Sequence, residues 1–160
     1  MIKIIKGDLL MASETIIAHQ VNTRGAMNGG LAQQIRSTYP KAFEEYNILV
    51  NRHRANKDQE DLRSTLLGKV QGVNLGGRYI ANMFGQEFYG SDGKKYTDEA
   101  ALYECLLKVR TIAEKSGNDV AMPYLIGCGL GGADWTDVES LILDAFNGYS
   151  VTLYKWEGKQ

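Results

Sequence analysis

Residues 16–30, "IIAHQVNTRGAMNGG", pass from an apolar run into a segment crowded with amides, a charge and three glycines. The run Ile16-Ile17-Ala18 predicts a buried strand, and Gly29-Gly30 lead directly into the apolar positions of a helix. In open α/β sheets, ligands sit beyond the carboxyl ends of the strands, where glycine lets a loop approach closely. We therefore expect an α/β fold with a ligand-holding loop after this strand.

A second segment has the same order of strand, glycine-rich loop and helix. Residues 126–132, "IGCGLGG", follow the strand-like run 119–122 and precede a helical pattern that starts at Thr136. One glycine-rich loop is a weak signal, because many such loops only turn a corner. Two of them could wrap a diphosphate from opposite sides through backbone N–H groups, without a lysine clamp.

The rest of the chain alternates β-rich runs with segments of helical period, which favours a three-layer α/β/α sandwich. We expect two short helices around Pro40, a third with Thr97 as cap and Gly117 as stop, and a fourth opened by a capping box at 136–139. The central sheet should be mixed, because 74–77 resembles a hairpin turn. Strands are predicted at 2–6, 15–19, 68–74, 78–84, 119–122 and 150–156.

Composition narrows the class of protein. The chain has 160 residues and a formal net charge of −1, which fits one domain over 1–160 and gives no long-range attraction to nucleic acid or anionic membranes. No apolar run approaches the roughly 20 residues of a membrane helix. Cys105 and Cys128, with two histidines, offer neither a disulfide framework nor a metal-ligand spacing. We expect a cytoplasmic protein without a metal, a cofactor, a membrane partner or a nucleic-acid duplex partner.

Several short motifs together resemble a known family. Residues 7–9 (GDL) follow the first strand, 19–22 (HQVN) and 134–135 (DW) flank the glycine-rich loops, and 151–154 (VTLY) form the last strand. In this order they look like a macrodomain, the ADP-ribose-binding module, over nearly the whole chain. Within that family the chain is most similar to the compact branch. That branch holds the yeast-type ADP-ribose 1″-phosphate phosphatases and the hydrolases that release terminal ADP-ribose from glutamate.

The resemblance implies a set of ligand contacts. Asp8 would accept a hydrogen bond from the adenine amino group, the backbone of Leu9 would contact the ring, and Tyr154 would stack on it. Asp8 could instead cap a turn, and Tyr154 could pack as an ordinary edge residue. Asn22 would bind the distal ribose, with a local Asx turn as the alternative. Gly29, Gly30 and Leu31 would line the distal ribose and phosphate, and Gly127, Cys128, Gly129, Leu130 and Gly131 would donate N–H groups to the diphosphate.

The resemblance also bears on catalysis. The glutamate-linkage hydrolases use a lysine and an aspartate, but Gln86 and Gly131 stand at those positions here, so that mechanism cannot be carried over. The phosphatase branch implies His19, at a strand end, and Asp134, at the mouth of the second glycine loop. Asp134 would activate a water and His19 would donate a proton to the leaving oxygen. Each also has a structural alternative: a buried strand histidine, and an acidic residue that favours a helix start.

Residues 85–96 form a long connection that could close over the site, with Phe84, Phe88 or Tyr89 shielding the distal ribose. The alternative, which the sequence favours, is a mobile surface loop without that function. Three functional classes remain open. The preferred one is a metal-independent hydrolase that removes a phosphate, acyl or protein-linked ester from the terminal ribose of ADP-ribose. The second is a catalytically silent module that binds ADP-ribose or an ADP-ribosylated protein. The third is a nucleotide-binding α/β protein with another ligand, although the phosphate loop of nucleoside triphosphatases is absent from the sequence.

Overall fold

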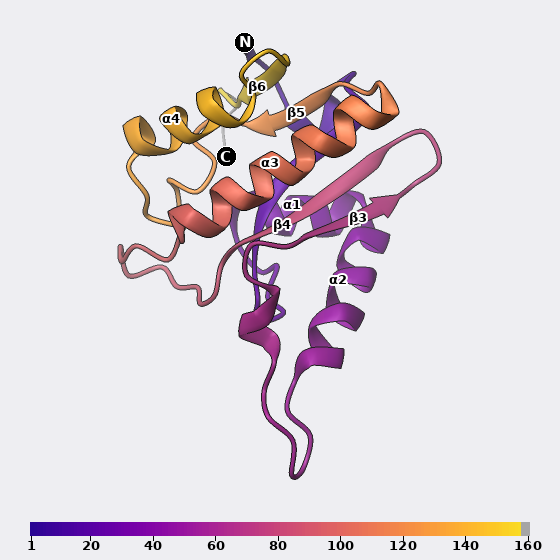
Figure 1. The fold of residues 1–160 in the computed structure, drawn as a ribbon, viewed down its shortest axis with the longest axis vertical. Coiled ribbons are helices and arrows are strands. Elements are labelled where there is room, and N and C mark those ends of the chain that lie inside the picture. The colour runs from indigo at the N-terminus through magenta and orange to yellow at the C-terminus, as the bar shows by residue number, and fades with distance from the viewer. Residues whose placement is uncertain (158–160) are drawn as a thin grey trace.

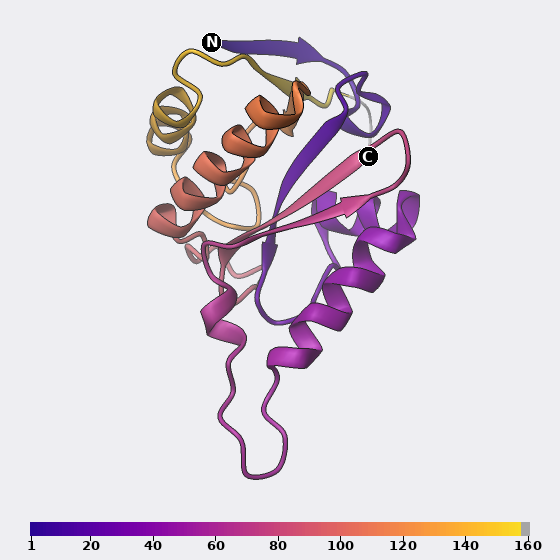
Figure 2. The same cartoon turned by 45° about the vertical axis from the view of Figure 1, so that its right-hand side comes forward.

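The computed structural model describes residues 1–157, which form a central sheet with helices on both faces (Figure 1). Helices α3 and α4 cover one face, and α1 and α2 cover the other (Figure 2). The strands are β1 (Ile2–Lys6), β2 (Ile16–Asn22), β3 (Val70–Asn74), β4 (Tyr79–Gln86), β5 (Val120–Pro123) and β6 (Val151–Lys155). The helices are α1 (Gly30–Thr38), α2 (Pro40–His53), α3 (Glu99–Ser116) and α4 (Trp135–Ala145), with short 3-10 turns η1 (Leu9–Met11) and η2 (Arg63–Leu66).

The strands lie in the order β1-β6-β5-β2-β4-β3. Within residues 1–157, neighbours from β1 to β4 pair in parallel, and β3 runs antiparallel, beside β4. The hairpin between β3 and β4 follows from its turn residues, because Asn74 accepts the Gly76 N–H through its side chain and Leu75 N–H donates to Arg78. The predicted three-layer sandwich with a mixed sheet is confirmed.

Alternation along β2 divides the apolar core between the two faces. Ile16 and Ala18 pack in the cluster under α3 and α4, whereas Ile17 packs in the cluster under α1 and α2. Successive side chains of a strand point to opposite faces. The neighbouring polar residues His19 and Gln20 therefore point in opposite directions, His19 toward α1 and α2 and Gln20 toward α3.

The end of β2 differs from the sequence expectation. The strand continues to Asn22 instead of ending at His19, because it pairs with β4 along its whole length. A register shift between Val21 and Asn22 then turns the chain into the following loop. The functional consequence is that His19 lies in mid-strand.

Two helix starts also differ. Asp98, not Thr97, caps α3 through its carboxylate, while the Thr97 hydroxyl is turned to a neighbouring loop. The capping box predicted at 136–139 is wrong, because α4 begins directly after Asp134, whose carboxylate accepts the N–H of Thr136. An aspartate two residues earlier already caps the helix start by accepting the Thr136 N–H. The predicted stop of α3 at Gly117 is confirmed as a left-handed C-cap with φ of 70°.

The structure also bears on the predictions for membrane spans and cysteines. No helix within residues 1–157 is long and apolar enough to cross a bilayer. Both cysteines are free thiols, Cys105 buried on α3 and Cys128 half-buried in the loop after β5. Burial raises the pKa of the Cys105 thiol to about 12, which is expected for a thiol packed as an apolar group.

Candidate functional site

The segments predicted to hold a ligand lie at one edge of the sheet. Because β1, β6, β5, β2 and β4 are parallel, their carboxyl ends point to the same side. The chain leaves this edge through connections 7–8, 23–29, 87–98 and 124–134. We call these four connections the loop rim.

The two glycine-rich loops touch within the loop rim. Cδ1 of Leu130 lies 3.1 Å from the position that a Cβ would take on Gly29, and 3.7 Å from the corresponding position on Gly30. Leu130 remains 54% exposed, so the contact lies at the surface. The meeting of the two loops, on which the sequence interpretation depends, is present in the structure.

The loop after β5 presents backbone N–H groups that the fold leaves free. Cys128 is the exception, because its N–H donates to the Leu125 carbonyl at 2.9 Å, which differs from the sequence expectation. Successive free N–H groups in a loop form a concave site for an anion. Within residues 1–157, no protein acceptor is recorded for the N–H groups of Gly127, Gly129, Leu130 and Gly131.

The other glycine-rich loop ends in the uncapped N-terminus of α1. Gly29 is the N-cap and makes no side-chain hydrogen bond, and the first turn contains no acidic residue. Gly30 has φ of 58°, a left-handed conformation that suits glycine. The first N–H groups of a helix have no partner within the helix and carry a partial positive charge. This end of the loop rim is therefore also suited to an anion.

A set of polar side chains behind the loops supports the β5–α4 connection. Gln20 Nε2 donates to Thr97 Oγ1 at 2.8 Å and to Gln86 Oε1 at 2.7 Å. Thr97 Oγ1 in turn donates to the Gly127 carbonyl at 2.8 Å, and the Thr97 N–H donates to the Gly131 carbonyl at 2.9 Å. We call Gln20, Gln86 and Thr97 the rim network. It ties β2, β4 and the start of α3 to the second glycine loop.

Gln86 and Gly131 stand at the positions where the glutamate-linkage hydrolases carry lysine and aspartate. Gln86 belongs to the rim network, and Gly131 contacts it. A Cβ on Gly131 would lie 2.6 Å from the Gly127 carbonyl oxygen and closer still to the threonine hydroxyl of the rim network. No side chain fits there without moving the loop. Gln86 uses its carbonyl for Gln20 and donates its amide to the Phe88 carbonyl at 2.8 Å. Both positions are structural in this chain.

Asn22, predicted to bind the distal ribose, is buried and shapes its own loop. Its side-chain oxygen accepts hydrogen bonds from the Arg24 N–H and the Tyr46 hydroxyl, each at 2.9 Å. Its amide donates to the Ala26 carbonyl at 2.8 Å. The Asx turn that was the alternative is therefore present, and one amide hydrogen remains for a ligand.

Asp8, Leu9 and Tyr154 lie together at the β1–β6 side of the loop rim. One carboxylate oxygen of Asp8 accepts an N–H from η1 at 2.9 Å, so Asp8 caps that turn and keeps its second oxygen for other partners. The Tyr154 ring lies 3.6 Å from the Cβ position of Gly7, and its hydroxyl donates to Glu14 at 2.5 Å. The three residues are brought together as expected, and their contacts with adenine stay predictions.

Asp134 is exposed where the second glycine loop enters α4. One of its oxygens accepts the Thr136 N–H at 2.9 Å, which makes it the N-cap and leaves the other oxygen on the surface side of the helix start. Burial and then the nearby charge of Asp134 raise the pKa of the Cys128 thiol to about 11. That thiol is protonated at neutral pH, so Cys128 is not an activated nucleophile.

His19 does not belong to the loop rim. It is 1% exposed, and its Nε2 lies 2.6 Å from Oδ1 of Asn82. Asn82 donates its amide to the Ala42 carbonyl on α2 and to the side chain of Gln71 on β3. The Asn82 oxygen is therefore the acceptor, which assigns the imidazole proton to Nε2. We call His19, Asn82 and Gln71 the buried network.

The position of His19 corrects the sequence expectation. The residue lies in the middle of β2 and faces α2, because the strand is longer than its apolar run indicates. Burial lowers the pKa of His19 to about 4, so the imidazole is neutral at pH 7. A neutral imidazole sealed under a helix is not placed to donate a proton to a ligand on the loop rim.

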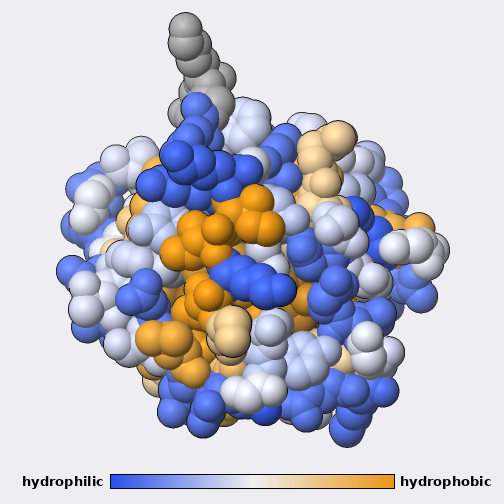
Figure 3. All heavy atoms as spheres, turned by 90° about the horizontal axis from the view of Figure 1, so that it is seen from above, coloured by the Kyte–Doolittle hydropathy of each residue, from blue (hydrophilic) through white to orange (hydrophobic). Residues whose placement is uncertain are grey.

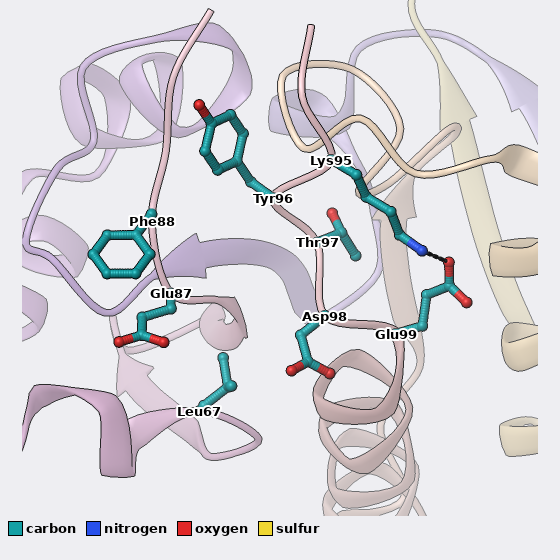
Figure 4. Close-up of a pocket in the computed structure, with 8 residues that line it drawn as sticks. All are labelled: Leu67, Glu87, Phe88, Lys95, Tyr96, Thr97, Asp98 and Glu99. Atoms are coloured by element: carbon teal, nitrogen blue, oxygen red, sulfur yellow. Dashed lines mark hydrogen bonds and ion pairs between the residues drawn. The ribbon is translucent and has the colours of Figure 1, made fainter. Parts of the chain in front are cut away.

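A cavity of about 460 Å³ lies between the two arms of the β4–α3 connection, which is part of the loop rim (Figure 4). Lys95 pairs with Glu99 on one wall, as the dashed line in Figure 4 shows. Glu87 on the other wall pairs with Arg24 of the first glycine loop, and the Arg24 guanidinium lies 4.6 Å from the Phe88 ring centroid. The two connections are thereby joined. The lining residues are Leu67, Glu87, Phe88, Lys95, Tyr96, Thr97, Asp98 and Glu99.

The aromatic residues considered as a shield behave differently from one another. Phe88 and Tyr89 are 56% and 53% exposed. Phe84 is fully buried and stacks on Tyr46 with ring centroids 5.8 Å apart, so the expectation for Phe84 is wrong. The physical reason is that β4 continues to Gln86 and directs the Phe84 ring into the core under α2. Closure by the other two stays a prediction.

The Macro domain model matches residues 18–142. The chain belongs to the macrodomain family. An ADP-ribose 1''-phosphate phosphatase from Lodderomyces elongisporus is 31% identical to this macrodomain over 162 residues, which cover 96% of the chain and 97% of the relative. A DNA ADP-ribosyl glycohydrolase from Mycobacterium tuberculosis is 31% identical over 140 residues, which cover 88% of the chain but 37% of that protein.

A solved structure agrees with this assignment. The macrodomain of Mycobacterium tuberculosis DarG superposes with a TM-score of 0.78 at 26% identity, over 96% of this chain and 97% of that one. The family resemblance inferred from the motifs at 7–9, 19–22, 126–132 and 151–154 is therefore confirmed. Within residues 1–157 of this macrodomain, no group of three or more potential metal-binding side chains comes together.

Proposed function

We propose that this macrodomain binds ADP-ribose and hydrolyses a substituent from its terminal ribose. The observation that carries the proposal is the contact of Leu130 with Gly29, which brings the free N–H groups of one glycine loop next to the uncapped start of α1. Two sets of backbone donors at one edge suit a diphosphate, whose charge they can neutralise without lysine or arginine. A relative named ADP-ribose 1''-phosphate phosphatase, matched over almost its full length, supports the same ligand.

The order of the connections along the loop rim suggests how the ligand lies. Adenine would lie at the β1–β6 side, against Asp8, Leu9 and Tyr154, because these residues offer a carboxylate oxygen and a ring in one place. The diphosphate would lie on the free N–H groups of Gly127, Gly129, Leu130 and Gly131. The distal ribose would then reach the loop 23–29 and the first turn of α1.

The proposed chemistry rests on Asp134. Its surface oxygen would take a proton from a water, and the water oxygen would attack the phosphorus or carbonyl carbon attached to the ribose. The bond from that centre to the ribose oxygen breaks, and the ribose oxygen takes up a proton from protonated Asp134 or from solvent. His19 is left out of this scheme because it is sealed under α2.

Calorimetry tests the binding step. We expect ADP-ribose to bind with one-to-one stoichiometry, and ATP and NAD to bind at least about tenfold more weakly, since neither presents a free distal ribose after a diphosphate. Absence of ADP-ribose binding would reject the proposal as a whole. Binding of ATP as tightly as ADP-ribose would favour a general nucleotide-binding protein.

A turnover panel with one matched pair of variants tests the chemistry. The substrates are ADP-ribose 1″-phosphate, O-acetyl-ADP-ribose and an ADP-ribosylated protein. Asp134→Asn keeps a good N-cap on α4 but removes the base, so kcat should fall about 10²–10⁴-fold while ADP-ribose affinity changes less than about threefold. Asp137→Asn, in the first turn of the same helix, removes the same charge and should leave kcat unchanged. Equal rates for both variants would contradict the role of Asp134.

Binding without catalysis is the second candidate. The burial of His19 favours it, because one of the two groups expected to perform chemistry is enclosed in the core. In that case all three substrates would bind and none would be turned over faster than in buffer.

A further inference from the structure

The outer edge of the sheet at β1 is open. Within residues 1–157, β1 pairs with β6 and has no strand on its other side. Apolar side chains on this edge are accessible: Ile4 and Ile5 in β1 are exposed by 53% and 42%, and Met1, just before the strand, by 73%. Figure 3 looks onto the end of the molecule where the N-terminus, β6 and α4 lie in Figure 1, and shows apolar residues gathered around a hydrophilic centre. An edge strand of this kind can pair with another strand.

The backbone of β1 shows which groups are free to pair. The Met1 carbonyl accepts from Val151 N–H and the Gly7 N–H donates to Lys155, so the residues at both ends of β1 bond to β6. Bonding alternates along a parallel pair, so residues 3 and 5 also face β6. The N–H and C=O groups of Ile2, Ile4 and Lys6 consequently point away from the sheet. These three residues offer the hydrogen-bonding pattern of a docking strand.

The charges around β1 identify the kind of strand that fits. Lys3, Lys6 and Lys155 are exposed on or beside this edge, and the Lys6 ammonium lies 3.8 Å from the Glu157 carboxylate. A second copy of the chain would place lysine-bearing strands side by side, which costs free energy and is a known means of preventing edge association. An acidic strand would gain opposite-charge pairs in the same positions.

We propose that β1 is a docking edge for an extended peptide segment that carries acidic side chains opposite Lys3 and Lys6 and an apolar side chain opposite Ile4. The segment adds as a strand beside β1, with its backbone paired to Ile2, Ile4 and Lys6. This mode of recognition takes affinity from main-chain hydrogen bonds and specificity from alternate side chains. The edge is separate from the loop rim, so the proposal does not depend on ADP-ribose binding.

The test uses a capped synthetic peptide, TVEVVET, and its lysine counterpart, TVKVVKT, titrated into the full chain with amide NMR as the readout. TVEVVET should shift the amides of Ile2, Ile4 and Lys6 more than those of Lys3 and Ile5, because only the former point outward. TVKVVKT should bind at least about tenfold more weakly. Charge reversal at Lys3 and Lys6 to glutamate should invert the preference between the two peptides.

A proline pair tests the backbone geometry. Ile4→Pro removes an outward N–H, which an edge strand tolerates, so the fold should remain and TVEVVET affinity should fall at least about tenfold. Ile5→Pro removes an N–H that bonds to β6 and should lower the melting temperature instead. Three outcomes would overturn the proposal: no peptide-induced shift on β1, equal binding of both peptides, or light scattering that shows a dimer of the chain without peptide.

Discussion

The buried network and the rim network begin at neighbouring residues of β2 but lie on opposite faces of the sheet and have different roles. His19 turns toward α2, where it bonds to buried Asn82, and Asn82 in turn donates to the Ala42 carbonyl on α2 and to the half-buried side chain of Gln71. Gln20 turns toward α3, where Thr97 and Gln86 support a loop whose N–H groups are free. The difference teaches that a polar residue near a strand end acquires its role from the face it points to. In this macrodomain the buried network joins the sheet to α2, and the rim network supports the loop that would bind a ligand.

The largest expected effect comes from displacing the loop that the rim network supports. Gly131→Ala places a methyl group 2.6 Å from the Gly127 carbonyl oxygen, so the loop must move and its free N–H groups lose their positions. We expect ADP-ribose affinity, measured by calorimetry, to fall on the order of 100-fold. Gly77→Ala is the matched control, since a Cβ there meets no atom within 4 Å. If Gly131→Ala binds ADP-ribose with the affinity of the wild type, the second glycine loop is not part of the binding site.

A smaller effect is expected from weakening the rim network without steric change. Thr97→Val keeps the shape but removes the hydroxyl that donates to Gly127 and accepts from Gln20. ADP-ribose affinity should fall about tenfold, and the free energy of unfolding by about 1–3 kcal/mol, because a buried donor is left unpaired. Thr111→Val is the control, because that hydroxyl bonds only within α3. If both variants bind ADP-ribose equally well, the Thr97 hydroxyl is not needed to hold the second glycine loop in its binding conformation.

Substitution of His19 in the buried network should have the smallest effect on binding. It should instead change how the free energy of unfolding depends on pH. The pKa of His19 is about 4 in the folded chain against 6.5 as the ordinary value, so the unfolded chain binds this proton first as the pH falls. The stabilising contribution of the neutral imidazole is complete above about pH 6.5 and is lost toward about pH 4. His19→Gln should leave ADP-ribose affinity within about twofold.

Urea unfolding at two pH values measures that contribution. Between about pH 7.5 and pH 4.5, the wild type should lose about 2–3 kcal/mol more unfolding free energy than His19→Gln, whose side chain does not titrate. Identical pH dependence in the two proteins would show that His19 is not held neutral by burial. A large loss of ADP-ribose binding in His19→Gln would instead connect the buried network to the site.

Much of the fold followed from local patterns in the sequence. Apolar runs located each strand that the structure describes in residues 1–157, and residues 74–77 predicted the hairpin that makes the sheet mixed. Helix caps were harder, because Thr97 and Asp98 are both good caps and only the tertiary contact of Thr97 with Gly127 decides between them. The same limitation explains α4, where Asp134 competes with a well-formed capping box.

The site was predictable in its backbone and less so in its side chains. Gly29, Gly30 and the second glycine loop could be found because glycine marks close approach of a chain. His19 was misplaced because the end of an apolar run is not the end of a strand when polar residues such as Gln20 continue the pairing. The part that Gln20 and Thr97 play in supporting the second glycine loop was missed. The usable signal for Gln20 was its parity, since it must face the opposite side of the sheet from His19.

A diphosphate site made of main-chain amides, as proposed for the loop rim, would be set by the path of the polypeptide chain. Nearly every amino acid supplies a backbone N–H group. Substitutions around such a site therefore change its affinity little, provided that the backbone conformation of the loops is kept. The inheritance of such a site then depends on a few glycines, chiefly Gly30 and Gly131, whose places no larger residue can take at low cost. Descendants of one ancestral protein can therefore exchange most of their side chains and still recognise the same nucleotide.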